Sequence, residues 1–224
     1  MRISVIIPTL NEESCLAGTL RLLRAEQPHE IIVVDGGSQD ATRERASSAD
    51  LVLAGPRGRA VQMNLGAAHA TGDVLLFLHA DCALEAGALD EAERCLAARR
   101  TVAGCFRMRV QAEGWRYRSI DACATARVRL SGVVYGDQGL FLRRGVFDAA
   151  GGFPRLALME DLFFSLRLRR LGRVVVASRQ VFVSPRRWQQ TGLMSQTLRN
   201  WGLTALAAAG IAPDRLARYY PPVR

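Results

Sequence analysis

Lysine is absent from this sequence of 224 residues: all 30 of its Lys+Arg side chains are arginine, against 21 acidic ones, and the formal net charge is +9. A P-loop NTPase binds its phosphates with a lysine, so this class is excluded. A nucleotidyltransferase with an α/β core is disfavoured too, since it needs a glycine-rich activating loop and a lysine near its start. Arginine is planar, always charged and suited to binding two phosphate oxygens at once.

Cysteine pairs and long apolar runs are also missing. The five cysteines are odd in number and include no Cys-x-x-Cys pair. This indicates reduced core residues in a cytosolic protein rather than a disulfide or zinc framework. The longest apolar stretch, residues 201–212, is far shorter than the roughly 20 residues that cross a bilayer. The apolar N-terminus is too short for a signal peptide. We therefore expect a cytoplasmic protein.

The arginines are spread along the chain, and no zinc-finger, RNA-recognition or basic-zipper pattern is present, so we expect no nucleic-acid partner. Peripheral contact with the inner face of a membrane is an alternative use of the basic surface, because aromatic side chains among arginines suit an anionic bilayer. The sequence is compatible with a dimer as well as with a single chain. The candidates for membrane contact are Trp188, Trp201, Tyr219 and Tyr220.

Residues 1–81 alternate short β-branched runs with helical patterns, which is typical of βαβ units and a mostly parallel sheet. Strands are expected at residues 3–8, 30–35, 51–54 and 74–78, and helices at 13–24, 40–46 and 59–70. The later pattern predicts helices at 86–99, 115–130 and 161–171 and strands at 105–110, 139–143, 173–177 and 181–183. The fold class is α/β: an open, mixed, mostly parallel sheet flanked by helices. It forms a single domain with a helical C-terminal extension over residues 184–224.

Polar residues gather in the loops that follow the first four predicted strands, and ligands of open α/β sheets bind outside the carboxyl ends of the strands. Asp35 follows a buried strand and suits ribose hydroxyls or a base N–H, but no Gly-x-Gly-x-x-Gly is present to indicate a dinucleotide site. Asp81 and His79 offer an oxygen and a nitrogen to Mn²⁺ or Mg²⁺. Arg59 opens a helix whose N-terminus favours an anion, and Asn64 is either polar packing or a base contact.

Five segments stand out in order along the chain: residues 5–12 (VIIPTLNE), 32–40 (IVVDGGSQD), 59–66 (RAVQMNLG), 76–81 (LFLHAD) and 159–161 (MED). Together they resemble the family 2 glycosyltransferases of the GT-A fold, which transfer sugars from nucleotide diphosphates with inversion. The tail at residues 216–224 and the Gln-Met-Asn helix are also similar to a small bacterial subfamily labelled as arsenosugar-biosynthesis glycosyltransferases.

The resemblance implies a role for each matching residue. Asp161, beside Glu160, would be the base that deprotonates the acceptor hydroxyl, and Asp81 with His79 would hold Mn²⁺ or Mg²⁺ on the diphosphate. The implied partners are a nucleotide-diphosphate sugar, UDP-linked by family default, and a small or lipid-linked acceptor. Residues 1–81 would form the nucleotide-binding half of a domain spanning residues 1–183, and residues 82–183 the acceptor half. The resemblance and the positions of the polar residues together give the expected donor-binding set: Pro8, Thr9, Asn11, Glu12, Asp35, Gly37, Arg59, Asn64, Ala80, Asp81, Asp137, Gln138, Arg187 and Trp188.

Some features depart from the family pattern or admit a second reading. Family members usually carry Asp-x-Asp where this chain has a histidine at position 79 and an aspartate at position 81. If that histidine abolishes metal binding, the alternative to an enzyme is a non-catalytic nucleotide-sugar sensor. Processive members carry Gln-x-x-Arg-Trp where this chain starts with Ser184, which argues against a polymer synthase. Arg186, Arg187 and Trp188 would close over the diphosphate as a charged, stacking lid. Two pairs have purely structural alternatives, a helix cap for Glu160 and Asp161 and a turn for Asp137 and Gln138.

Overall fold

The computed structural model describes residues 1–192 and, beyond them, residues 195, 199, 202, 203, 206, 211 and 213–216. For residues 187, 190, 191 and 214 it describes only the backbone. Trp201, Tyr219 and Tyr220 therefore lie outside the described residues, as does most of the tail at residues 216–224.

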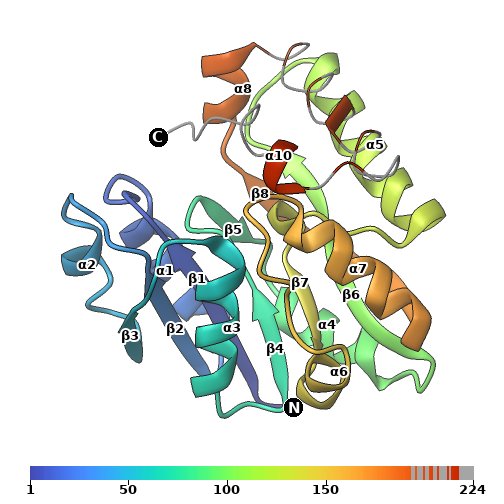
Figure 1. Cartoon of the computed structure of the whole chain (residues 1–224), viewed down its shortest axis with the longest axis horizontal. Coiled ribbons are helices and arrows are strands. Elements are labelled where there is room, and N and C mark those ends of the chain that lie inside the picture. The colour runs from blue at the N-terminus through green and yellow to red at the C-terminus, as the bar shows by residue number, and fades with distance from the viewer. Residues whose placement is uncertain are drawn as a thin grey trace.

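Eight strands form a single sheet in the order β3-β2-β1-β4-β7-β6-β8-β5 (Figure 1). All neighbouring pairs from β3 to β4 are parallel, as is the pair β6 and β8, whereas β7 and β5 run against the other strands. This arrangement confirms the expected mixed, mostly parallel α/β sheet. The strands are β1 (Ile3–Thr9), β2 (Glu30–Asp35), β3 (Leu51–Ala54), β4 (Val74–Phe77), β5 (Cys82–Leu84), β6 (Thr101–Val110), β7 (Leu140–Arg143) and β8 (Arg173–Val183).

Helices cover both faces of this sheet, and in Figure 1 α5 lies at the side of the molecule opposite α2 and β3. None of the described helices is long and apolar enough to cross a lipid bilayer. The helices described are α1 (Leu16–Ala25), α2 (Thr42–Arg45), α3 (Arg59–His69), α4 (Ala88–Ala97), α5 (Trp115–Ser131), the 3₁₀ turn η1 (Gly136–Gln138), α6 (Arg144–Ala149), α7 (Glu160–Leu171), α8 (Arg186–Thr191) and α10 (Pro213–Leu216).

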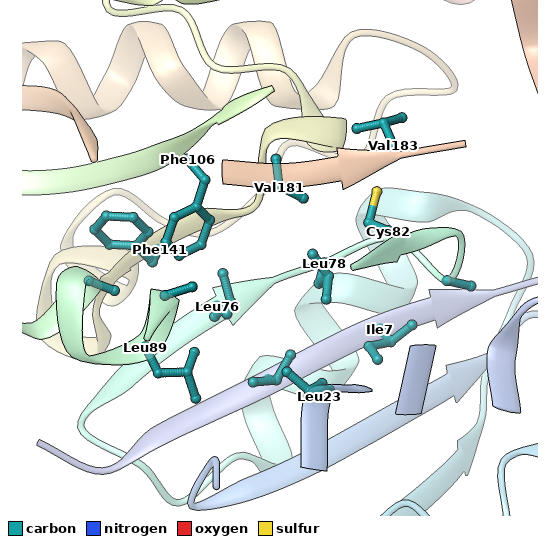
Figure 2. Close-up of a cluster of buried hydrophobic side chains, with 14 of the residues drawn as sticks. Ile7, Leu23, Leu76, Leu78, Cys82, Leu89, Phe106, Phe141, Val181 and Val183 are labelled. Atoms are coloured by element: carbon teal, nitrogen blue, oxygen red, sulfur yellow. The ribbon is translucent and has the colours of Figure 1, made fainter. Parts of the chain in front are cut away.

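Alternate residues of the central strands enter two separate cores. Ile7 and Leu76 point into a cluster with Phe106 and Phe141, which Figure 2 shows in close-up. Their chain neighbours, such as Ile6 and Phe77, enter a second cluster on the other face, which α3, α6 and α7 cover. Because side chains alternate along a strand, a run that is apolar at every position must be covered on both faces. The two cores thus account for the continuously apolar strands of the sequence.

Gly66 of α3 allows this helix to lie close to the sheet. A methyl group placed on Gly66 would lie 2.5 Å from Cγ2 of Ile6 and 3.1 Å from Cγ2 of Val34, both in neighbouring central strands. A side chain here would force the helix away from β1 and β2. α3 begins at Arg59, and Gln62 in its first turns bonds to the backbone at the carboxyl ends of β1 and β2.

The main differences from the sequence expectations lie in the second half. Residues 173–183 form one strand rather than two, and Ser178, in the expected gap, donates its backbone N–H and its hydroxyl to Glu91 of α4. A register irregularity between Cys105 and Arg107 of β6 takes up the extra residues of β8. The short strand β5 was not predicted, since three residues are too few to show a period.

Candidate active site

The loops that follow β1 and β2 are joined by side-chain hydrogen bonds. The amide oxygen of Asn11 accepts from the backbone N–H of Gln39 at 2.9 Å, and the Asn11 N–H donates to Ser38 Oγ at 2.9 Å. Ser38 in turn donates to Asp35, whose oxygens also accept the backbone N–H of Gly37 at 3.2 Å. Asp35 is buried and organises its own loop, while Asn11 and Gly37 are exposed.

Gln62 holds the carboxyl ends of β1 and β2 together from the adjoining helix. Its buried amide donates to the backbone oxygens of Thr9 and Val34, both at 2.8 Å. Gly36 leaves room for this amide, since a methyl group there would lie 2.9 Å from Gln62 Nε2. Thr9 is itself buried, and Pro8 is half-buried beside it. The floor under the two loops is therefore built from backbone and one amide rather than from flexible side chains.

Glu12 connects the first loop to α8. Its Oε2 accepts from Nη2 of Arg186 at 3.1 Å and from the thiol of Cys15 at 3.3 Å. Burial, reinforced by the charge of Glu12, raises the pKa of the Cys15 thiol to about 12. Cys15 therefore stays a protonated hydrogen-bond donor. The contact brings the start of α8, far along the chain, back to the loop after β1.

Arg59 and Glu160 form an ion pair between the first residues of α3 and α7, with 3.4 Å from Nη1 to Oε1. Only 3 % of Glu160 is exposed, whereas Arg59 is partly open to solvent. Burial raises the pKa of Glu160, the Arg59 charge opposes this shift, and the neighbouring charge of Asp161 adds to it. The structure therefore places Glu160 behind Arg59, as a group that orients the guanidinium.

The raised pKa of Glu160 gives a pH-dependent stability. Its contribution to folding is fully present below the ordinary value of 4.5 and is lost as pH rises through the higher folded-state value. Glutamine does not ionise, so the melting temperature of Glu160→Gln relative to wild type is expected to become more favourable as pH rises from 4 to 8. Thermal melts across this range test it, with the exposed Glu44→Gln as the control. A Tm difference that is constant or falls with pH would contradict the shift.

Asp161 is half-exposed and its carboxylate is fixed by backbone amides. Oδ2 accepts from the N–H of Gly136 at 2.8 Å, and Oδ1 accepts from the N–H of Leu162 at 2.7 Å. A methyl group on Gly136 would lie 2.7 Å from Nε2 of His79 and 3.7 Å from Oδ2 of Asp161. The imidazole of His79 and the carboxylate of Asp161 thus flank one glycine, with no side chain between them.

Two turns with left-handed backbone support these groups. Met159, directly before the Glu160-Asp161 pair, has φ +65°, and Asn11 in the loop after β1 has φ +54°. A left-handed conformation is costly for a residue such as methionine and persists where the surrounding structure imposes it, often at functional sites. At Met159 it turns the chain into α7 so that Glu160 is buried and Asp161 remains half-exposed.

His79, Asp81 and Cys82 form a group of three polar side chains after β4, with one ligand atom from each lying within 4.8 Å of the others. Burial, reinforced by the charges of Asp81 and Asp137, raises the pKa of the Cys82 thiol well above its usual range. Cys82 also packs in the core of Figure 2 with Val183. The imidazole and the carboxylate are therefore the donors that suit a hard divalent cation, and the thiol is a buried neighbour that the sequence did not single out.

Three of the expected donor-binding side chains are used inside the protein instead. Asn64 bonds both its amide ends to the backbone of Phe153, at 2.8 and 2.9 Å, and so joins α3 to the turn after α6. Gln138 is fully buried and accepts from Arg127 of α5. Trp188 is only 9 % exposed, and its side chain packs in the core cluster shown in part in Figure 2 rather than standing open to solvent.

The remaining expected residues fall as follows. Ala80 is buried, and its carbonyl accepts from Thr19 at 2.6 Å. Asp137 lies in η1, close enough to Cys82 to affect its thiol. The side chain of Arg187 lies outside the described residues. Gly136 was not identified from the sequence as a site residue, because nothing in the Tyr-Gly-Asp-Gln segment indicates that its glycine lies against His79.

These loops meet because of the strand directions. Residues that follow β1, β2 and β4 lie at the carboxyl edge of the sheet. Since β7 runs antiparallel to β4, the turn η1 that precedes it lies at the same edge. The site therefore combines groups from both halves of the chain: the Asn11 and Asp35 loops, the His79 and Asp81 segment, and Asp161.

The sequence was compared with known families and proteins. The family model described as "Glycosyl transferase family 2" matches residues 4–153. The O-antigen chain rhamnosyltransferase RfbN of Salmonella typhimurium is 26% identical over 200 residues, which cover 77% of this chain and 62% of that protein.

Solved structures show the same fold. A mannosyltransferase, PcManGT from Pyrobaculum calidifontis, in complex with GDP-Man and Mn²⁺, is 23% identical with a TM-score of 0.62, over 79% of this chain and 56% of that one. S. aureus TarS 1-349 in complex with UDP-GlcNAc is 18% identical with a TM-score of 0.65, over 82% of this chain and 58% of that one. The fold is thus of the GT-A type.

This chain spans less than two thirds of the length of each of these three proteins. The family match, however, covers well over half of the chain itself and includes the loops after β1, β2 and β4 and the turn η1. The chain belongs to glycosyl transferase family 2.

Proposed function

We propose that this protein is an inverting glycosyltransferase that moves a sugar from a nucleotide diphosphate to a small or lipid-linked acceptor. The observation that carries the proposal is the juxtaposition across Gly136: the half-exposed carboxylate of Asp161 on one side, and His79, followed by Asp81, on the other. An inverting transfer needs a base for the acceptor and a means of stabilising the diphosphate that leaves from the opposite face of the sugar.

The proposed donor site lies over the loops after β1 and β2. We infer that Asn11 and Gly37, which are exposed, and Pro8, Thr9, Glu12 and Asp35 beneath them shape the nucleoside pocket. Arg59 is oriented by Glu160 at the N-terminus of α3, where a guanidinium and free backbone amides favour a diphosphate. Residues 1–81 would then bind the donor and residues 82–183 the acceptor.

Asp81 and His79 fit a divalent cation, Mn²⁺ or Mg²⁺, because they supply an oxygen and a nitrogen donor at the site edge next to the proposed diphosphate position. Such an ion, when bound, would stabilise the negative charge of the leaving nucleoside diphosphate. The complexes of PcManGT with GDP-Man and Mn²⁺ and of GalNAc-T7 with UDP, GalNAc and Mn²⁺ support this assignment by analogy.

Asp161 would take the proton from the acceptor hydroxyl. As that proton moves to the carboxylate, the acceptor oxygen forms a bond to the anomeric carbon, and the bond from that carbon to the diphosphate oxygen breaks. Two backbone N–H donors hold the carboxylate in place before the acceptor arrives, which reduces the entropy lost on the way to the transition state. A single displacement of this kind inverts the anomeric centre.

The finer subfamily assignment, arsenosugar biosynthesis, and the cytoplasmic location rest on the sequence resemblance and composition. UDP is the family default for the donor, while the similar proteins carry either GDP-Man or UDP-GlcNAc in their complexes. A test of the donor therefore has to compare bases as well as sugars.

Thermal melts with a panel of UDP-, GDP- and dTDP-sugars, each with Mn²⁺, Mg²⁺ or a chelator, test the proposal. A donor present at about a hundred times its Kd is expected to raise the Tm by roughly 5–10 °C, and only with a metal present. The matching nucleoside monophosphate is the control, because it lacks the diphosphate that the cation and Arg59 would contact. If no nucleotide diphosphate raises the Tm with either metal, the donor site is wrong.

A further inference from the structure

An open groove of about 500 Å³ lies between α5 and the adjoining strands β6 and β8, and it belongs to no part of the site described above. Arg107 and Arg109 of β6 line one wall, and Arg129 and Leu130 of α5 line the other. Met108 and Gln180 are among its remaining lining residues. The groove therefore presents three arginines and the carboxylate of Asp121, which lies 3.9 Å from Nη1 of Arg109, beside apolar side chains.

The segment that builds the groove is strongly basic. Residues 107–130 hold six arginines and two acidic residues. Of the acids, Asp121 is buried and pairs with Arg118 at 2.9 Å, and Glu113 precedes the helix. Among the described residues, Arg107 and Arg129 form no ion pair with an acidic side chain, and both are exposed. Their charges are therefore available to an anionic partner.

Large apolar side chains stand at the two ends of the solvent face of α5. Trp115 is 74 % exposed and Leu130 is 86 % exposed. Ser119, Ala122 and Ala126 continue the same face between them at helical spacing, and all three are exposed. The helix has 17 residues and is about 25 Å long. Trp115 and Leu130 are the two most exposed of the large apolar side chains among the described residues, and each is next to an arginine in the sequence.

We propose that this face, formed by α5 and the exposed arginines of β6, docks on an anionic lipid bilayer. Tryptophan and leucine insert at the boundary between headgroups and acyl chains, and arginines alongside bind the lipid phosphates. A nucleic acid would not account for the exposed Leu130, because phosphate recognition gains nothing from an aliphatic anchor. The proposal adds α5 to the membrane contacts expected from the sequence, of which Trp188 is buried and Trp201, Tyr219 and Tyr220 lie outside the described residues.

Docking here would also place the bilayer close to the proposed acceptor half. Arg127 of α5 lies 3.4 Å from the centre of the Tyr135 ring and donates to Gln138. Tyr135 directly precedes Gly136, and Gln138 follows it two residues later; the Gly136 N–H donates to Asp161. α5 is thus joined through η1 to the proposed base. Docking itself does not depend on the proposed transfer reaction and can be tested without any sugar donor.

Flotation with vesicles tests the docking. The full chain is mixed with vesicles of phosphatidylcholine alone or with one-third phosphatidylglycerol, at low and high salt. We expect binding only to the anionic vesicles, and weaker binding as salt rises. The double variant Arg107→Gln/Arg129→Gln should bind about fivefold more weakly per arginine, or roughly 25-fold in total. The control Arg43→Gln/Arg45→Gln removes the same charge from exposed positions on α2 and should bind like wild type.

A second variant, Trp115→Ser/Leu130→Ser, removes the apolar anchors and keeps every charge. It should lose binding at high salt first, where only insertion remains, while Leu22→Ser, at another exposed leucine, should not. Equal binding to neutral and anionic vesicles, no vesicle binding, or equal loss in the α2 control would overturn the proposal. Arginine-dependent binding to single-stranded nucleic acid without vesicle binding would also overturn it and assign the face to that partner.

Discussion

Asp161→Asn is expected to lower kcat for sugar transfer by about 10²- to 10⁴-fold, the range that a positioned general base contributes. The asparagine amide has the same shape as the carboxylate and keeps an oxygen that can accept the N–H of Gly136 or Leu162. It does not accept the acceptor's proton. Donor affinity should change little, so the loss appears in kcat and not in the donor-induced rise of the Tm. Release of nucleoside diphosphate, with and without acceptor, measures it.

The matched control is Asp148→Asn on α6, where the aspartate is exposed and lies outside the proposed site. It should leave turnover within about twofold of wild type, as most surface substitutions do. The comparison also separates an enzyme from a nucleotide-sugar sensor. Slow donor hydrolysis that disappears in Asp161→Asn supports the enzyme. If the protein binds the donor but Asp161→Asn and Asp148→Asn show the same residual hydrolysis, it is a sensor.

Most of the strands could be predicted from the sequence, whereas the roles of single polar residues could not always be predicted. Runs such as residues 31–34 are apolar at every position, which only a strand covered on both faces explains, and β2 is fully buried there. By contrast, Asn64 and Gln138 are polar residues in the right loops whose partners, Phe153 and Arg127, are set by tertiary packing. No local pattern distinguishes an amide that binds a ligand from one that binds backbone.

The pair at the start of α7 shows where this limit lies. Successive residues of a helix point about 100° apart, so the sequence alone implies that Glu160 and Asp161 face different surroundings. Which of them is buried depends on the left-handed turn at Met159 and on the position of Arg59 on another helix. The family resemblance predicts Asp161 as the base, and only the packing explains why Glu160 would serve as a positioning residue for Arg59.

Asp81→Ala is expected to lower the turnover by about 10³-fold or more, because a metal ion supplies several kcal/mol of transition-state stabilisation. Unlike Asp161→Asn, this change should also remove the metal-dependent part of donor binding. The rise in Tm with a donor and Mn²⁺ should fall to the value seen with a chelator. Asp90→Ala, at an exposed aspartate of α4, is the control and should keep the full metal-dependent rise. A variant that still gains stability from donor and metal together would show that Asp81 is not a ligand.

We expect His79 to influence which ion the proposed site prefers, and a pair of substitutions isolates its contribution. If the imidazole is a ligand, His79→Ala should reduce the rise in Tm that the donor gives with Mn²⁺. His79→Asp should restore this rise and give a larger one with Mg²⁺, because carboxylate oxygens suit the harder ion and imidazole nitrogen suits Mn²⁺ better. His79 also lies against Gly136, so His79→Ala tests packing as well. A different result would assign His79 to packing and leave Asp81 as the protein ligand of the ion. In that case His79→Ala lowers the Tm without donor, but the donor-induced rise in Tm with Mn²⁺ keeps the same ratio to the rise with Mg²⁺ in wild type and in both variants.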